Sequence, residues 1–236
     1  VDAKTHEKIS TGREEDKFGI DIDLIPDVFR HAATLPGIEP VGLAVHIGSQ
    51  LTSLDPFEQA FSRVGLMVKT LRDAGYAVSR LDLGGGLGIV YDEENPPKPA
   101  AYAALVANTV GKLDVELTFE PGRVLVGNAG ILVTSVIQIK ETKTKRFVVV
   151  DAAMNDLIRP TLYDAFHAVA PVNENKGNNK QNAEIVGPVC ETGYILAKNA
   201  QLPIMHENDL LFFRSAGAYG AVMASSYNSR LLIPEV

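Results

Sequence analysis

LDLGGGLG, residues 81–88, is the stretch that decides the fold, because an apolar run passes there directly into three glycines. Two runs of the same kind flank it, VGLAVHIGSQ at 41–50 and ELTFEPGR at 116–123, and a fourth, KFGI, lies at 17–20. Each run is short, apolar and closed by a polar or glycine-rich turn, which is typical of buried β-strands. The sequence therefore predicts four strands in the first half of the chain.

Helix-like segments separate these strands, at 23–34, 55–74 and 99–112. In the second segment Asp55 is expected to cap the N-terminus of the helix, and Gly75 to follow its C-terminus. Strands that alternate with helices of this length form right-handed βαβ units around a parallel sheet.

The strand ends recur with a nearly constant period. His46 lies 38 residues before Gly84, and Gly84 lies 36 residues before Glu120. That period predicts a (β/α)₈ barrel, with an open doubly wound sheet as the competing architecture. A closed barrel needs about 250 residues, so residues 1–130 are expected to hold its C-terminal half, with the other half upstream of residue 1.

The pattern changes after residue 130. Short β-branched runs bounded by turns replace the helical periods, and only 156–168 keeps a helical spacing. Residues 131–236 are therefore predicted to form a mostly β domain, a barrel or a sandwich, in which the polar segment 173–182 is an exposed, flexible loop. The expected strands are 131–139, 146–150, 184–189, 193–197, 209–213 and 221–226.

The composition of the 236-residue chain excludes several classes of protein. A formal net charge of -7 argues against a nucleic-acid partner, because nucleic-acid-binding domains usually carry a basic stripe. No apolar run reaches the roughly 18 to 20 residues of a membrane span. The single cysteine cannot form an internal disulfide. We expect a cytoplasmic protein with no membrane segment and no bound metal.

Glycines and polar residues follow two of the strands. The triplet Gly84, Gly85 and Gly86 lets backbone N–H groups approach an anion, although a tight turn without a ligand explains it equally well. His46 could stack on a planar cofactor, and the Ser49 hydroxyl could donate to a phosphate. A lone histidine at a strand end is nevertheless more often structural.

The third strand end, FEPGR, carries Glu120, Gly122 and Arg123. A carboxylate here could pair with a protonated ring nitrogen, and an arginine could clamp a carboxylate or a phosphate. An isolated Glu–Arg pair is usually a surface salt bridge. Three strand ends with such residues, at barrel spacing, favour a functional site much more strongly than any one of them does.

Several motifs occur along the chain in one order: THEKISTG, KFGI, HIGSQ, DLGGGLGI, FEPGR, IRPTLY, GPVCETG and AGAYGAVMASSYNSR. Together they resemble the diaminopimelate decarboxylases, pyridoxal-phosphate-dependent enzymes of the alanine-racemase-like, fold-type III group. The likeness covers essentially the whole chain. Cys-Glu-Thr at 190–192 resembles that branch rather than the ornithine branch, which has Cys-Asp.

The resemblance implies roles for individual residues. His46 would stack on the ring of pyridoxal 5′-phosphate, and Glu120 would keep the ring nitrogen protonated. Cys190 would return a proton to the substrate carbon, reaching into the active site of a partner subunit in a homodimer with shared active sites. The other residues at the cofactor would be Ser49, Gly84, Gly85, Gly86, Gly122, Arg123 and Tyr219. The residues that bind substrate would be Arg123, Arg159, Tyr163, Glu191 and Tyr219.

The charges of the substrate favour diaminopimelate independently. Its far end is a second amino-acid group, which needs a cation for the carboxylate and an anion for the ammonium, and Arg159 with Glu191 supplies that pair. The expected activity is the decarboxylation of meso-diaminopimelate to L-lysine, the last step of lysine biosynthesis. The alternatives are a related decarboxylase acting on carboxynorspermidine, ornithine or arginine, and a non-catalytic homologue that binds the cofactor.

The chain also departs from the family pattern. The Schiff-base lysine of the family lies in a segment resembling YAVKAN, and none of Lys4, Lys8 and Lys17 has that context. We therefore expect a fragment, inactive alone, that lacks the upstream half of the barrel and a closing strand after Val236. Tyr194 stands where an acidic residue is usual.

Overall fold

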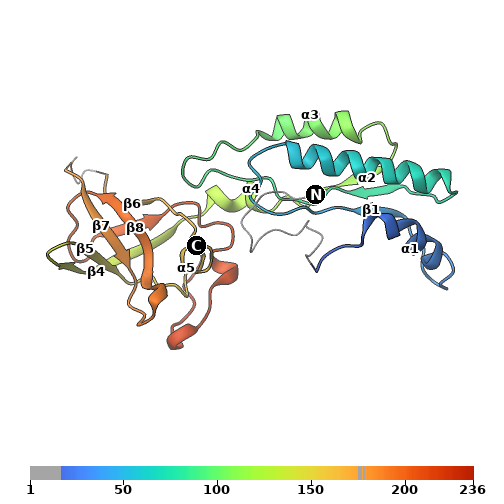
Figure 1. Ribbon diagram of the computed structural model, residues 1–236. Helices are drawn as coiled ribbons and strands as arrows, with labels where there is room; N and C mark the ends of the chain where they lie inside the picture. The colour runs from blue at the N-terminus through green and yellow to red at the C-terminus, as the bar shows by residue number, and fades with distance from the viewer. Residues whose placement is uncertain (1–16, 175–176, 178) are drawn as a thin grey trace. The chain divides into compact units, whose positions relative to one another are not determined.

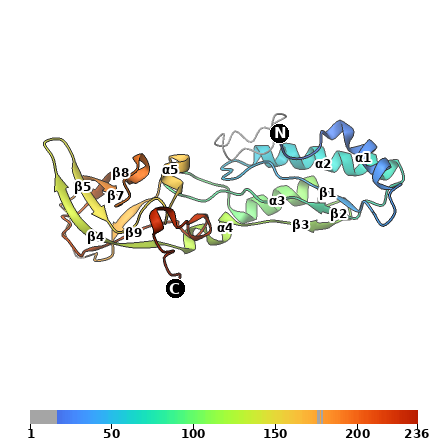
Figure 2. The same ribbon diagram turned by 90° about the horizontal axis from the view of Figure 1, so that it is seen from below.

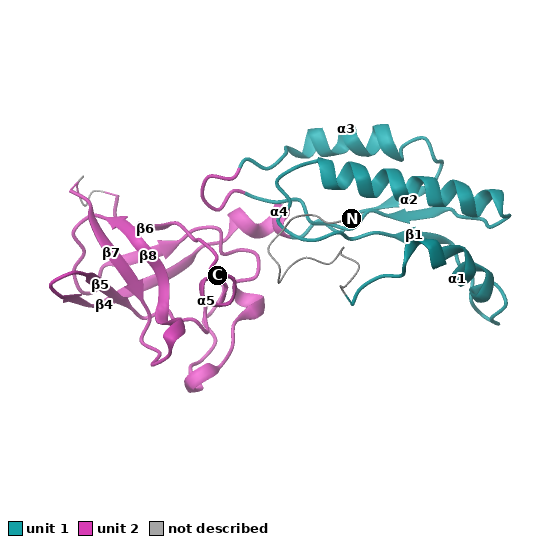
Figure 3. Cartoon of the chain, in the orientation of Figure 1, with its two compact units in different colours: residues 1–89, 95–122 teal, residues 90–94, 123–236 magenta. Residues whose placement is uncertain are grey.

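The computed structural model describes residues 17–174, 177 and 179–236. The chain divides into two compact units, which Figure 3 colours separately. The first unit runs up to Ile89 and includes Asn95–Gly122, whereas the second comprises Val90–Glu94 and Arg123–Val236. The second unit therefore begins before residue 131 and takes in a short segment of the first half. Lys4, Lys8 and the motif at 5–12 lie outside the described residues.

The first unit contains a parallel sheet of three strands, β1 (Gly42–Ala44), β2 (Arg80–Asp82) and β3 (Glu116–Thr118), in the order β1-β2-β3. Its register pairs Ala44 with Asp82 and Asp82 with Thr118. The structure thus confirms three of the four predicted strands. Because the strands are parallel and in register, the segments that follow them emerge at one edge of the sheet.

The fourth predicted strand, at 17–20, is wrong. These residues form bends without a hydrogen-bonded neighbour among the described strands. Gly19 has a φ of +78°, which interrupts an extended backbone, and the side chains of Phe18 and Ile20 are 56% and 57% exposed. An apolar run forms a strand only where a partner strand satisfies its backbone.

Three helices accompany the sheet: α1 (Ile25–Ala32), α2 (Asp55–Asp73) and α3 (Pro99–Thr109). Helices α2 and α3 lie side by side (Figures 1 and 2). Apolar residues recur along α2 at helical spacing and form one core with Leu81 of β2 and Val110. The residues that α2 buries are Phe57, Ala60, Phe61, Val64, Gly65, Val68 and Leu71.

The ends of α2 correct one prediction and explain another. Asp55 is not the N-cap: the cap position is Leu54, and the Oγ atom of Ser53 accepts the Asp55 N–H at 3.2 Å. At the other end Gly75 has a φ of +92°, and the N–H of Tyr76 donates to the carbonyl of Leu71 at 3.0 Å. This is a Schellman ending, which a glycine just after the helix favours.

The second unit is built on a six-stranded sheet with the order β6-β9-β4-β5-β7-β8. Its pairs are antiparallel except for β5 with β7, which are parallel. The outer strands β6 and β8 also approach each other, so the sheet curls toward a closed shape. The strands are β4 (Leu132–Glu141), β5 (Arg146–Val150), β6 (Val169–Pro171), β7 (Gln181–Val186), β8 (Ile195–Leu202) and β9 (Leu210–Phe213).

Several predicted details of this unit need correction. Residues 221–226 are not a strand, because Ala221–Met223 form a 3₁₀ turn in which Val222 is 84% exposed. Only Arg159–Tyr163 of the expected helix at 156–168 is helical, as α5. Strand β7 starts at Gln181, inside the loop expected at 173–182, of which residues 175, 176 and 178 are outside the described residues.

The unit also contains the short helix α4 (Arg123–Val126). Across the described parts of the chain, we found no helix with the length and apolar character needed to cross a bilayer.

Candidate functional site

The carboxyl edge of the three-stranded sheet brings together the residues predicted at its strand ends. His46 and Ser49 follow β1, the glycine triplet follows β2, and Glu120 follows β3. The N–H of Glu120 donates to the carbonyl of Gly84 at 2.8 Å, which ties the second strand end to the third. We refer to His46, Gly84, Gly85, Gly86 and Glu120 as the glycine edge.

Close backbone approach explains why glycines occupy this edge. A Cβ atom on Gly85 would lie 2.3 Å from the carbonyl oxygen of Glu120, and one on Gly86 would lie 2.3 Å from that of Gly48. Gly84 and Gly86 have positive φ values of 64° and 105°, which other residues rarely adopt. The three positions therefore require glycine, and a glycine-rich backbone at a strand end is of the kind that can cradle a phosphate.

Hydrogen bonds already use part of this backbone. The N–H of Gly84 donates to Oδ1 of Asp82 at 2.8 Å, and the N–H of Gly85 donates to Nδ1 of His46 at 3.3 Å. The second bond is long and would yield to a stronger acceptor. It also leaves Nδ1 of His46 as an acceptor, so a neutral imidazole carries its proton on Nε2. His46 and Glu120 are exposed and accessible to a ligand.

The second unit assembles another cluster around Tyr91. The guanidinium carbon of Arg159 lies 4.4 Å from the centre of the Tyr91 ring, and Nη1 of Arg123 donates to the Tyr91 hydroxyl at 2.5 Å. Arg123 also stacks on Tyr219, at 4.7 Å from the ring centre. Both arginines are only 7% exposed. We call Tyr91, Arg123, Arg159, His167 and Tyr219 the arginine cluster.

Burial lowers the pKa of Arg159, and the neighbouring Arg123 charge lowers it further. An arginine stays protonated even so. No Asp or Glu forms an ion pair with Arg159 in the part of the chain that the structure describes. A buried cation of this kind is stabilised when an anion binds beside it.

His167 is also buried in the arginine cluster, with a side chain that is 2% exposed. Its Nε2 lies 2.8 Å from Nη1 of Arg159, and its Nδ1 lies 2.9 Å from the carbonyl oxygen of Arg214. Burial lowers the pKa of His167 to about 4; the Arg214 carbonyl opposes this change, and the charges of Arg159 and Arg123 add to it. The imidazole is therefore neutral at pH 7.

This pKa predicts a loss of stability in mild acid. The unfolded chain binds a proton on His167 near pH 6.5, whereas the folded chain binds it only near pH 4, so the free energy of unfolding falls as the pH drops between these values. The loss should total about 3 kcal/mol. Urea unfolding of the full-length protein between pH 7 and pH 4 measures it. The variant His167→Gln should flatten the dependence, whereas His31→Gln, at an exposed position, should not. Equal slopes in the two variants would contradict the assignment.

Cys190 and Glu191 lie in the loop before the 3₁₀ turn Thr192–Tyr194, and both are exposed. The Tyr227 hydroxyl donates to Oε2 of Glu191 at 2.8 Å. Because the Glu191 carboxylate accepts this hydrogen bond, it raises the pKa of Tyr227. The Oγ1 atom of Thr161 on α5 donates to the carbonyl of Gly193 at 2.9 Å. The loop is thereby fastened to the helix that begins with Arg159 and ends with Tyr163.

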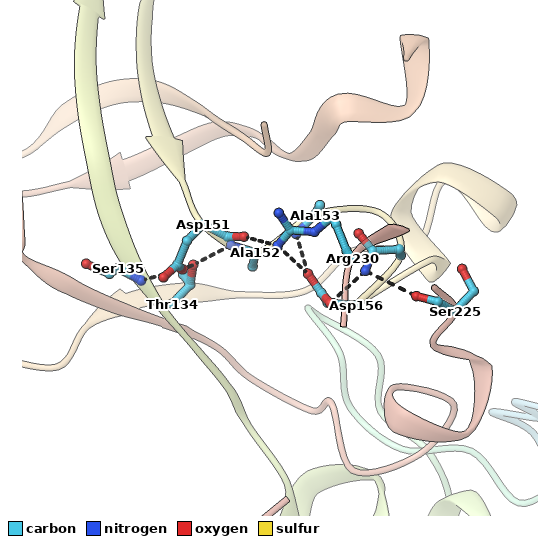
Figure 4. A network of polar contacts seen from close by, with 9 residues as sticks. Thr134, Ser135, Asp151, Ala152, Ala153, Asp156, Ser225 and Arg230 are labelled. Atoms are coloured by element: carbon cyan, nitrogen blue, oxygen red, sulfur yellow. Dashed lines mark hydrogen bonds and ion pairs between the residues drawn. The ribbon is translucent and has the colours of Figure 1, made fainter. Parts of the chain in front are cut away.

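A polar network joins the segment after β5 to the segment that contains Ser225 and Arg230 (Figure 4). The buried carboxylate of Asp156 accepts the N–H of Ala153 at 2.8 Å and lies 3.5 Å from Nη2 of Arg230. Arg230 also donates to the carbonyl of Asp151 at 2.5 Å, and the N–H of Ser225 donates to the carbonyl of Asn155 at 2.9 Å. The network therefore joins the turn after β5 to residues 225–230.

Removing the centre of this network should destabilise the second unit. Asp156→Ala removes the acceptor of the buried Ala153 N–H and the carboxylate that pairs with the partly buried Arg230, and we expect a loss of about 2–4 kcal/mol in the free energy of unfolding. The matched control is Glu141→Ala, since Glu141 is 67% exposed and pairs with Arg146 at 3.4 Å. Exposed pairs contribute at most about 1 kcal/mol. Urea unfolding measures both, and equal losses would show that the network is not needed.

Three contributors escaped the sequence analysis: Tyr91, His167 and Tyr227. Tyr91 follows the glycine triplet closely, and an aromatic residue just beyond such a turn was the available signal. His167 offered none, and Tyr227 lies in the motif AGAYGAVMASSYNSR without a role being assigned to it, because each acts through a contact with a residue distant in the sequence.

Comparison with known proteins shows which family this chain resembles. The family model described as "Pyridoxal-dependent decarboxylase, C-terminal sheet domain" matches residues 22–217. The diaminopimelate decarboxylase of Zymomonas mobilis is 48% identical over 100% of this chain and 56% of its own length. That of Neisseria meningitidis serogroup A is 50% identical over 100% of this chain and 58% of its own length.

The solved structures agree with the sequence relatives. A crystal structure of diaminopimelate decarboxylase from Helicobacter pylori complexed with L-lysine has a TM-score of 0.94 and 40% identity, and covers 99% of this chain and 58% of its own. The chain thus spans a little over half the length of the relatives it matches.

Proposed function

Because the chain belongs to the family of pyridoxal-dependent decarboxylases, we propose that the full-length protein converts meso-diaminopimelate to L-lysine and CO₂. The proposed reaction is the last step of lysine biosynthesis. A small-molecule biosynthetic reaction and a single cysteine both favour a cytoplasmic location.

The observation that carries the choice of substrate is the buried Arg159 with no carboxylate partner among the described residues. Burial has removed water from the Arg159 guanidinium. A ligand carboxylate that reaches this group makes a charge-assisted, bidentate contact in place of the water. Diaminopimelate has a carboxylate at its far end, whereas lysine, ornithine and arginine do not. A substrate without that group would leave the guanidinium buried and unpaired.

The glycine edge fits pyridoxal phosphate. Bare backbone at Gly84, Gly85 and Gly86 can accommodate a phosphate, and the exposed imidazole of His46 can stack on a planar ring. When bound, the cofactor supplies an electron sink for the electron pair left behind as CO₂ departs. In our proposal Ser49 and the N–H of Gly122 complete the phosphate site, and the cofactor lysine belongs to a part of the protein outside this chain.

Each residue of the proposed site would then have its own role in the reaction. Glu120 holds a proton on the pyridine nitrogen. Arg159 binds the distal carboxylate and Glu191 the distal ammonium, and Cys190 delivers a proton to the carbon that has lost CO₂. The remaining substrate contacts would come from Arg123, Tyr163 and Tyr219.

We further propose that the first unit is part of a (β/α)₈ barrel. The βαβ order, the parallel register and the functional residues at the carboxyl ends of β1, β2 and β3 support it, because barrel enzymes place their sites at that end.

A substrate panel tests the proposed reaction. The full-length protein with pyridoxal phosphate should release CO₂ from meso-diaminopimelate far faster than from ornithine, arginine or carboxynorspermidine. Preference for one of these three would favour the related decarboxylases. Cofactor binding without CO₂ release from any of them would favour a non-catalytic homologue.

We also propose a homodimer with shared active sites, in which the exposed Cys190 acts in the partner's site. Two inactive full-length variants, Cys190→Ala and one lacking the cofactor lysine, should recover about a quarter of the wild-type activity after subunit exchange, by random assortment. Sedimentation and activity measured on the same mixture give the result. A mixed dimer that forms without recovering activity would place the whole site within one chain.

A further inference from the structure

Building on the proposed function, we propose that His167 is a positioning residue that, together with the ring of Tyr91, orients the Arg159 guanidinium toward the distal carboxylate of the substrate. None of the expected cofactor or substrate contacts includes either residue.

The hydrogen bonds of His167 fix its tautomer. A backbone carbonyl only accepts, so the 2.9 Å contact with Arg214 places the imidazole proton on Nδ1. A guanidinium only donates, so Nε2, at 2.8 Å from Nη1 of Arg159, must present its lone pair. Both contacts are satisfied together only by a neutral imidazole, which agrees with the lowered pKa of His167.

Tyr91 restrains the same two side chains. Its ring meets that of His167 edge to face, with ring centres 5.5 Å apart at 77°, and it lies 4.4 Å from the guanidinium carbon of Arg159. Tyr91 is 8% exposed and His167 is 2% exposed. Packing of this kind leaves a supporting side chain few alternative rotamers.

The chemistry of these two neighbours leaves the charge of Arg159 available. A carboxylate in the place of His167 would orient the guanidinium equally well, but it would also neutralise the charge and remove the need for an anionic ligand. A neutral acceptor and an aromatic face orient the cation without neutralising it. His167 therefore contributes to the specificity for a substrate with a distal carboxylate, although it does not touch that substrate.

An isosteric pair of variants in the full-length holoenzyme separates orientation from charge. Both His167→Gln and His167→Glu place an oxygen acceptor within reach of Arg159, but only the glutamate brings a charge. We expect His167→Gln to keep KM for diaminopimelate within about threefold of wild type. His167→Glu should raise KM about tenfold or more, with kcat changed much less, because a charge-assisted contact is lost. The inhibition constant of L-lysine, which lacks the distal carboxylate, should be similar in both variants.

Thermal unfolding of each variant accompanies the kinetics. If His167→Glu does not fold, His167→Asn replaces it: the shorter amide can still donate to the Arg214 carbonyl but does not reach Arg159, and the same rise in KM is expected.

Three results would overturn the proposal: equal KM values in the glutamine and glutamate variants, an effect on kcat alone, or failure of both the glutamate and the asparagine variant to fold. The last would give His167 a purely structural role. A wild-type holoenzyme that does not decarboxylate diaminopimelate would instead refute the proposed function, which keeps the two failures distinct.

Discussion

Gly85→Ala in the full-length protein is expected to impair cofactor binding severely. The added Cβ would lie 2.3 Å from the carbonyl oxygen and 3.2 Å from the carbonyl carbon of Glu120. Both are backbone atoms, so a strand end must move. Overpacking of this kind costs about 1–3 kcal/mol, which corresponds to a rise of roughly 5- to 150-fold in the dissociation constant of pyridoxal phosphate.

A matched glycine gives the control for this experiment. In α2 a Cβ on Gly65 would meet Val110 at 3.5 Å and Leu113 at 3.6 Å, which are ordinary contacts. Gly65→Ala should therefore leave cofactor affinity unchanged and stabilise the helix by about 1 kcal/mol. Equilibrium dialysis with the cofactor, together with thermal unfolding, measures both variants. Unchanged affinity in Gly85→Ala would argue against the glycine edge as the phosphate site.

Arg159→Ala is expected to lower kcat/KM for diaminopimelate by about 30- to 5,000-fold. This range corresponds to about 2–5 kcal/mol, the usual loss when one partner of a desolvated charge pair is removed. The loss should be selective, because a ligand without the distal carboxylate makes no contact that the mutation removes. Binding of L-lysine should therefore change little, or improve as the buried charge disappears.

Glu120→Gln provides the contrast to Arg159→Ala. This substitution weakens the interaction that keeps the ring nitrogen protonated, not the recognition of the substrate. The value of kcat/KM should therefore fall by a similar factor for every substrate. Steady-state kinetics and L-lysine binding distinguish the two patterns. Unchanged kcat/KM for diaminopimelate in Arg159→Ala would remove the physical reason for preferring this substrate.

The sequence alone was sufficient to predict features that depend on the local order of residues along the chain. The period from His46 through Gly84 to Glu120 predicted that these residues meet at one edge, and the parallel register of β1, β2 and β3 brings them there. The strand at 17–20 failed because pairing, which the sequence does not display, decides whether an apolar run becomes a strand. Asp55 failed as a cap because Ser53 supplies the oxygen instead.

The arginine cluster was predicted only in part. Arg123, Arg159 and Tyr219 came from motifs, whereas Tyr91 had only its place just beyond the glycine triplet and His167 had no local pattern. Their importance lies in contacts between segments that are far apart in the chain. The same holds for the contact between Tyr227 and Glu191. Residues that support a binding residue become visible only when the fold brings these segments together.

The products formed from diaminopimelate labelled with ¹³C in both carboxyl groups test the account most directly. The full-length protein with pyridoxal phosphate should form one labelled CO₂ for each L-lysine, and the lysine should keep one labelled carboxyl. The reaction should stop there, because L-lysine lacks the carboxylate that Arg159 binds. Release of a second CO₂ with formation of cadaverine, or no release of CO₂ at all, would contradict the account.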